Sequence, residues 1–146
     1  MHRAGLVALA GATAFAAAGC GSGRLSHDQF VAHADAVCSA YDAKVQLLSR
    51  PRSYADIVAY VGQTLPLYVA ALDKLKALQP PRDDEDAVRA WLALNDRVVA
   101  TVRRLRAAAL RHDPAGTNDA STAMQAASLA SRRAAAALGL TACASP

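Results

Sequence analysis

The sequence predicts an all-α protein, an antiparallel up-down four-helix bundle closed by one disulfide. Apolar residues recur at intervals of three and four along most of the chain, which is typical of helices with one buried face. Proline and glycine divide this pattern into four stretches, and short connections between helices favour antiparallel neighbours. Two cysteines, Cys38 and Cys143, lie in the first stretch and after the last one.

The first two helices are expected to start at His27 and at about Tyr54. Ser26 precedes the first helix in a Ser-x-x-Gln capping box, and Ser53 offers an N-cap to the second, which should end near Gln79. The inner residues of the first helix are Phe30, Ala34, Val37, Tyr41, Val45 and Leu48. Those of the second helix are Ile57, Val58, Val61, Leu65, Tyr68, Leu72, Leu75 and Leu78.

The third helix is expected to open with the acidic run 83–86 after Pro80-Pro81, because acidic residues complement the N-terminal end of the helix dipole. Its inner residues are Val88, Trp91, Asn95, Val98, Val102 and Leu105. We interpret residues 112–116 as a loop, followed by an alanine-rich fourth helix that Thr117 or Asn118 caps. Gly139 followed by Leu140 predicts a Schellman ending that turns residues 141–143 back toward the bundle.

The N-terminal segment predicts export. Residues 1–19 hold Arg3 and then an uncharged apolar run, too short for a membrane span of ~20 residues and arranged like a secretory signal peptide. Ala17-Ala18-Gly19-Cys20 resembles the lipobox of bacterial lipoproteins, with Ala17 where a larger aliphatic residue is usual. The resemblance implies lipidation at Cys20 and an extracytoplasmic protein anchored to the cell membrane by its lipid. The alternative is cleavage after residues 16–18, which releases a soluble protein.

The domain assignment follows from these segments. We assign 1–19 to the signal peptide, 20–25 to the lipidated cysteine and a flexible tether, and 26–146 to the bundle domain. Three cysteines leave one unpaired, but lipidation of Cys20 leaves Cys38 and Cys143 as a pair. A bridge between these two would close a loop of about a hundred residues and stabilise the fold by up to ~4.7 kcal/mol through the entropy of loop closure.

Three stretches carry a further resemblance: Ala34-Asp35-Ala36-Val37-Cys38, Leu78-Gln79-Pro80-Pro81 ahead of Trp91-Leu92-Ala93-Leu94, and Leu138-Gly139-Leu140-Thr141-Ala142-Cys143. Together they resemble a group of small actinobacterial secreted or lipid-anchored helical proteins of unknown function. The resemblance supports pairing of the two cysteines. It supplies no catalytic or binding residue.

The residues that carry chemistry in proteins are not grouped for catalysis here. His27, His33 and His112 lack the spacing of a helical metal pair, so we expect no metal site and no cofactor. Haem ligation by Met124 with a histidine stays open as an alternative. Because no nucleophile elbow is present and a helix start accounts for the carboxylates at 83–86, we expect no enzyme. A net charge of +4 with few aromatics does not indicate a nucleic-acid partner.

Two groups of residues are candidates for binding. The first is an outer stripe of arginines, suited to anionic lipid or envelope polymers, although we favour a solvated helix face; it comprises Arg97, Arg104 and Arg111, with Arg132 and Arg133 from the next helix. The second is a possible ligand pocket among inward-facing residues, although we favour ordinary core; it comprises Tyr41, Tyr68, Trp91 and Asn95.

These observations predict a non-enzymatic cell-envelope lipoprotein. It would act as a binding or interaction module, held on the outer face of the membrane and in contact with an envelope protein or polymer. The alternative function is a carrier of a small apolar or haem-like ligand inside the bundle.

Overall fold

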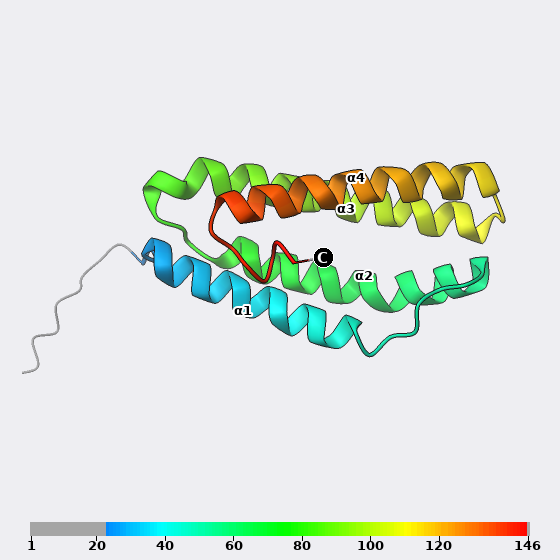
Figure 1. Cartoon of the computed structure of the whole chain (residues 1–146), viewed down its shortest axis with the longest axis horizontal. Coiled ribbons are helices and arrows are strands. Elements are labelled where there is room, and N and C mark those ends of the chain that lie inside the picture. Colours follow the sequence, from blue (N-terminus) through cyan, green and yellow to red (C-terminus); the bar gives the residue numbers. More distant parts are fainter. Residues whose placement is uncertain (1–22, 146) are drawn as a thin grey trace, which may run out of the picture.

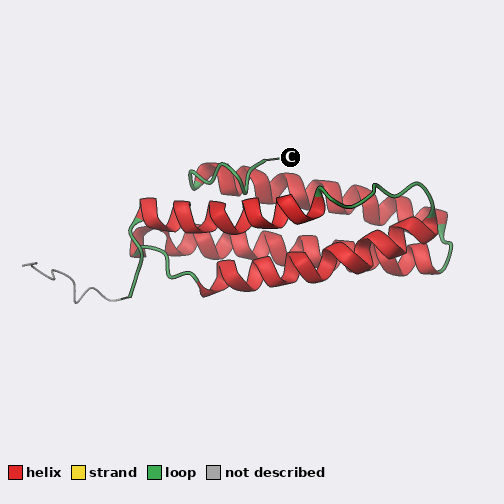
Figure 2. Ribbon diagram, turned by 90° about the horizontal axis from the view of Figure 1, so that it is seen from below, coloured by secondary structure: helices red, strands yellow, loops and turns green. Residues whose placement is uncertain are grey.

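Four long helices make up the described part of the computed structural model, residues 23–145. Helix α1 spans His27–Val45, α2 Tyr54–Ala77, α3 Glu85–Leu110 and α4 Pro114–Ala137, and a single 3-10 turn, η1, spans Arg82–Asp84 (Figure 1). Figure 2 shows only helices and loops across these residues. The all-α fold with four packed helices is therefore confirmed. The predicted signal peptide, 1–19, and Cys20 lie outside the described residues.

The four helices do not share contacts equally. Helix α3 packs most extensively against α4, then against α2, and α1 packs against α2. No comparable contact joins α1 to α4 within residues 23–145. Instead the segment that follows α4 folds back beside α1 (Figure 1). The bundle is thus closed by a loop at one end and stays open along the rest of the α1–α4 side.

Helices α1 and α2 start at the predicted capping residues. Ser26 and Gln29 exchange the two hydrogen bonds of a capping box, and the Ser53 hydroxyl accepts from the backbone N–H of Asp56 at 3.1 Å. Helices α1 and α2 end at Val45 and Ala77, slightly earlier than the apolar pattern indicated.

The predicted start of α4 was wrong. Residues 114–116 form its first turn instead of a loop, because Asp113 is the N-cap and accepts from the backbone N–H of Gly116 at 2.9 Å. Pro114 occupies the first helical position, where its missing N–H costs nothing. A side chain at Gly116 would collide with the Asp113 carboxylate and press on Ala108 of α3, so glycine is required where the two helices approach.

The apolar core lies at one end of the bundle, where α1 begins and α4 ends (Figure 1). Its largest fully buried side chains are Trp91, Phe30 and Leu140. Leu140 reaches the core through the predicted Schellman turn, which is confirmed. Gly139 has φ +77°, and the backbone N–H of Leu140 donates to the carbonyl of Ala135 at 3.0 Å.

The C-terminal segment is held to α1 by a disulfide and by one carboxylate. Cys38 and Cys143 are bridged, with their Cα atoms 5.2 Å apart, which confirms the predicted pairing. Asp35, one turn earlier on α1, accepts hydrogen bonds from the Thr141 hydroxyl and from three backbone N–H groups, those of residues 141–143, at 2.7–3.2 Å. The sequence analysis did not single out Asp35.

Two residues ahead of Ser26 contact the bundle. Arg24, which we assigned to the flexible tether, donates to the carbonyl of Pro80 at 3.1 Å and pairs with Glu85 at 3.0 Å. The backbone N–H of Leu25 donates to the carbonyl of Gln79 at 2.9 Å, and its side chain packs against the core. Residues 24 and 25 therefore contact the bundle at its closed end.

Helix α2 is long and apolar enough to cross a membrane, judged by length and composition alone. The same properties belong to the core helix of a soluble bundle. Here α2 packs against both α1 and α3, yet few of its residues are fully buried. Much of its apolar surface borders a space inside the bundle instead of packed side chains, as the next section describes.

Candidate functional site

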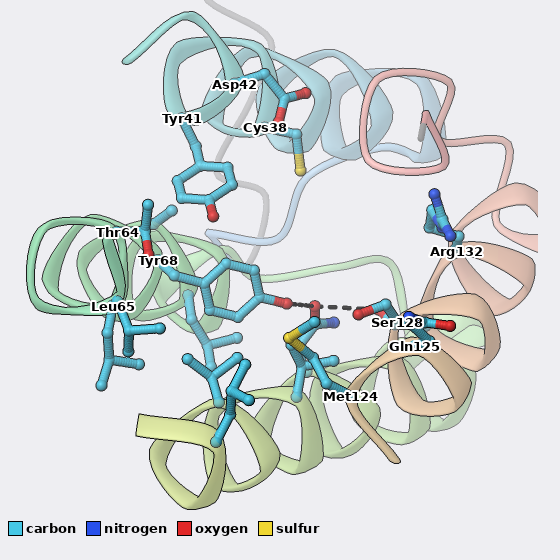
Figure 3. A pocket seen from close by; sticks show the side chains of 18 of the residues that line it. Cys38, Tyr41, Asp42, Thr64, Leu65, Tyr68, Met124, Gln125, Ser128 and Arg132 are labelled. Carbon is cyan, nitrogen blue, oxygen red and sulfur yellow. Dashed lines mark hydrogen bonds between the residues drawn. The ribbon is translucent and has the colours of Figure 1, made fainter. Parts of the chain in front are cut away.

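A cavity of about 930 Å³ lies inside the bundle, bordered by all four helices (Figure 3). Helices α2 and α3 give it mainly apolar walls, whereas α4 contributes several short polar side chains. From α2 these include Ile57, Val61, Leu65 and Leu72, and from α3 Val98, Val102 and Leu105; the polar residues of α4 include Ser121, Gln125, Ser128 and Ser131. Because exposed residues such as Gln125 and Ser145 also line it, the cavity opens to solvent.

The cavity follows from the lengths and side chains of the helices. Helix α1 has 19 residues, whereas the other three have 24 to 26, so α1 ends before it can cover the far half of α2 and α3. Helix α4 lines this gap mainly with short or flexible side chains, among them Ser121, Met124 and Ser128, which do not fill it. A large side chain on α4 would be needed to close the space.

All four residues of the predicted pocket line this cavity. Tyr41 and Tyr68 lie on one side, their rings edge to face with centroids 5.3 Å apart, and α4 lies across from them (Figure 3). Trp91 and Asn95 are buried, with exposures of 1% and 7%, as the ordinary-core interpretation requires. An ordinary core would not leave the open space that lies beside them.

Asn95 is the centre of a polar network that joins three helices. Its Oδ1 accepts from the Tyr68 hydroxyl of α2 at 2.6 Å and from the Ser131 hydroxyl of α4 at 3.1 Å. Its Nδ2 donates to the carbonyl of Trp91 at 2.9 Å. The buried amide is therefore satisfied by the protein, and the network fixes the register of α4 against α3. Ser131 was not predicted, because a serine among alanines on a helix gives no distinctive pattern.

Two buried polar atoms have no hydrogen-bond partner among residues 23–145: Trp91 Nε1 and Thr117 Oγ1. Both residues line the cavity. A buried polar group without a partner costs about 1–3 kcal/mol, so such groups are rare in folded proteins and call for an explanation. Both atoms are themselves shielded from the open space of the cavity by their neighbours.

One residue of each charge also lines the cavity, Asp42 from α1 and Arg132 from α4. Neither takes part in a salt bridge within residues 23–145. Burial raises the pKa of Asp42. Burial also raises the pKa of Tyr41 to about 12, with smaller contributions from Tyr60 and Asp42. The tyrosine hydroxyl is thus protonated at neutral pH and available as a donor.

The three histidines of residues 23–145 do not line the cavity. His27 bonds to Asp84 at 2.7 Å, an interaction that raises the pKa of His27, and His112 packs against Tyr54. Met124 lines the cavity, but no histidine of residues 23–145 lines it with Met124. In the same part of the chain, no cluster of three histidine, cysteine or acidic side chains is arranged to hold a metal ion.

The arginine stripe divides into two kinds of residue. Arg97, Arg104 and Arg111 are exposed on α3, and Arg111 lies 3.8 Å from Asp113. Arg133 is also exposed. Arg132, which we grouped with them, is half-buried at the cavity, because adjacent residues on a helix point about 100° apart. The structure therefore assigns Arg132 to the cavity and not to the outer face.

Together the fold and the site define a class: a disulfide-closed helical bundle with an apolar cavity that opens to solvent. Comparisons of the chain with protein-family models, curated proteins and solved structures found no match.

Proposed function

We propose that this protein is a non-enzymatic binding module of the cell envelope that holds a small, largely apolar ligand in its cavity. The observation that carries this proposal is the cavity itself, about 930 Å³ in volume with mainly apolar walls. Sites for small molecules typically enclose ~300–1,000 Å³ and combine apolar walls with a few polar groups. Of the two functions expected from the sequence, the carrier fits this cavity better than contact through the surface.

The location in the envelope is part of the same proposal. A signal peptide at 1–19 and the lipobox-like stretch ending at Cys20 support export and a lipid anchor. The Cys38–Cys143 disulfide supports an oxidising compartment, where such bonds persist. The antiparallel up-down order of helices also belongs to the proposal, since only the short segments 46–53, 78–84 and 111–113 join them.

The second candidate function is the binding of a polar partner at the surface of the protein. It is favoured by Arg97 and Arg104, which are exposed and join no salt bridge within residues 23–145. Such residues are also common on solvated helix faces, where they contribute little. The cavity therefore takes precedence over the arginine stripe as the functional site.

Binding of an uncharged fluorescent probe tests the cavity. N-phenyl-1-naphthylamine should bind the wild-type protein and change the fluorescence of Trp91, the single tryptophan of the chain. Ser128→Phe puts a ring into the cavity and should weaken probe binding about tenfold or more, equivalent to ~1.4 kcal/mol. Ala126→Phe, on the exposed side of the same helix, is the matched control and should bind like wild type.

The proposal fails if the wild-type protein neither binds the probe nor changes its Trp91 fluorescence. It fails equally if Ser128→Phe and Ala126→Phe bind the probe alike. The anchor is tested separately with a metabolic fatty-acid label. The label should mark the wild type and be lost in Cys20→Ala, and equal labelling of both would contradict lipidation at that residue.

A further inference from the structure

We propose that the cavity selects a single-chain amphiphile with an acidic head group, such as a long-chain carboxylate. Its head would lie beside Arg132, and its chain would run along α2 and α3 toward Leu105. This inference rests on the proposed binding function and names the class of ligand for the same cavity.

The cavity is long enough to hold one acyl chain. Its lining on α2 runs from Ile57 to Leu75, and eighteen residues of helix span ~27 Å. Two opposed leaflets of acyl chains make up the ~30 Å hydrocarbon core of a bilayer, so a single chain spans ~15 Å of it. One chain and its head group therefore fit along the cavity.

The basic side chain of the cavity, Arg132, lies toward one end. Ser131 bonds to Asn95, so Arg132 follows a residue of the Asn95 network, and Trp91 is one helical turn from Asn95. The far end of the cavity is bordered by Ile57 and Leu105. Thr117, Ser121 and Tyr60 are its polar residues there, and none of them is a lysine, arginine, aspartate or glutamate. A ligand with one charged end thus has one favourable orientation.

The charged group at this end is a donor. The Arg132 guanidinium joins no salt bridge within residues 23–145, and it can donate hydrogen bonds but cannot accept them. A carboxylate is the complementary group, because it accepts only and pairs with guanidinium in a two-bond geometry. A cationic head would meet Arg132 as a like charge. Figure 3 shows Arg132 on the α4 side of the cavity, across from Tyr41 and Cys38 of α1.

Asp42 is the one carboxylate that faces the cavity among residues 23–145, and it opposes an acidic ligand. It lies on α1 one turn beyond Cys38, and the tyrosines Tyr41, Tyr60 and Tyr68 are the other titratable groups facing the cavity. Asp42→Asn removes the like charge while keeping the size of the side chain. It should therefore strengthen binding of a carboxylate and leave binding of a neutral ligand unchanged.

Matched ligands and matched variants test the proposal. Stearate should bind the purified, processed protein about tenfold more tightly than methyl stearate, because a hydrogen bond to a charged carboxylate is stronger than one to a neutral ester. Arg132→Gln should abolish this preference. Arg133→Gln, the adjacent but exposed residue, should retain it. Stearate brominated near its carboxylate should quench Trp91 more strongly than stearate brominated near its terminal methyl.

The outcomes separate the ligand class from the binding function. Equal affinity for stearate and methyl stearate in the wild type overturns the acidic head group and leaves the proposed function standing. Stronger quenching of Trp91 by the terminally brominated stearate overturns the orientation. If Arg132→Gln weakens the binding of both ligands equally while the helical circular dichroism is unchanged, then Arg132 has a packing role and the head-group site is overturned. Binding of neither ligand to the wild type overturns the proposed function as well.

Discussion

The closed end and the open half of this bundle are built from the same helices but held together differently. At the closed end, α1, α2, α3, α4 and the C-terminal segment surround Phe30, Trp91 and Leu140. In the open half α1 has ended, and α2 and α4 face each other across the cavity. We infer that packing at the closed end stabilises the fold. The other half can therefore leave apolar side chains facing an unfilled cavity.

Covalent and polar contacts take the place of helix packing where the bundle closes. The C-terminal segment, and not α4 itself, covers α1, and it is fixed by Cys143 and by the Asp35 carboxylate. A helix in that position would fill the gap between α1 and α4 along its whole length. A short clamp at one end closes the bundle without doing so.

Removing the Cys38–Cys143 disulfide should cause the largest loss of stability. The variant carrying Cys38→Ser and Cys143→Ser should lose about 3–5 kcal/mol of unfolding free energy, because the bridge spans 105 residues and restricts the unfolded chain. Urea denaturation of the variant and of the oxidised wild type measures this loss. Reduced wild type should behave like the variant. A loss below about 1 kcal/mol would mean that apolar packing alone closes the bundle.

Truncating one apolar side chain in each region should sharpen the contrast. Phe30→Ala at the closed end should cost about 3–5 kcal/mol, since Phe30 is fully buried and its removal leaves a new void. Leu65→Ala, whose side chain already borders the cavity, should cost about 1 kcal/mol. Denaturant unfolding of both variants provides the comparison, and equal losses would contradict the division into two regions.

The Asp35 clamp should give a smaller effect with a defined pH dependence. Burial acts to raise the pKa of Asp35, but hydrogen bonds from Thr141, Cys143 and Ala142 outweigh it and lower the pKa overall. The stabilisation is therefore present above the ordinary value of 3.8 and is lost as the pH falls through the lower folded value. Asp35→Asn should cost about 1–2 kcal/mol at neutral pH.

Acid unfolding measures the contribution of Asp35. The difference in stability between wild type and Asp35→Asn should shrink as the pH falls below about 4. Asp73→Asn, an exposed carboxylate on α2 without a salt bridge in the described chain, is the matched control. A difference that stays constant down to low pH would show that the Asp35 carboxylate is not the group that holds the C-terminal segment.

Local signals in the sequence were sufficient for much of the fold. The capping box at Ser26, the turn at Gly139 and the pairing of Cys38 with Cys143 depend on neighbouring residues or on counting, and the structure confirms them. The start of α4 was missed, because Asp113-Pro114 resembles a turn as well as an N-cap followed by a first helical residue.

The sequence predicted the residues of the site but not the cavity between them. Inward-facing stripes placed Tyr41, Tyr68 and Trp91 toward one another, yet the same stripes are typical of a filled core. Whether a cavity remains between the helices depends on the separation of α1 and α4, which the spacing of apolar residues does not indicate. The roles of Asp35 and Arg132 also depend on tertiary contacts, so they emerged only from the structure.

The central claim is that the cavity holds a small ligand. Native mass spectrometry of the processed protein purified from the cell envelope tests it most directly. The wild type and Ala126→Phe should each carry one bound molecule of small mass, which organic solvent releases, and Ser128→Phe should carry none. A wild-type protein that stays free of any such adduct, even after incubation with stearate and methyl stearate, would contradict the account.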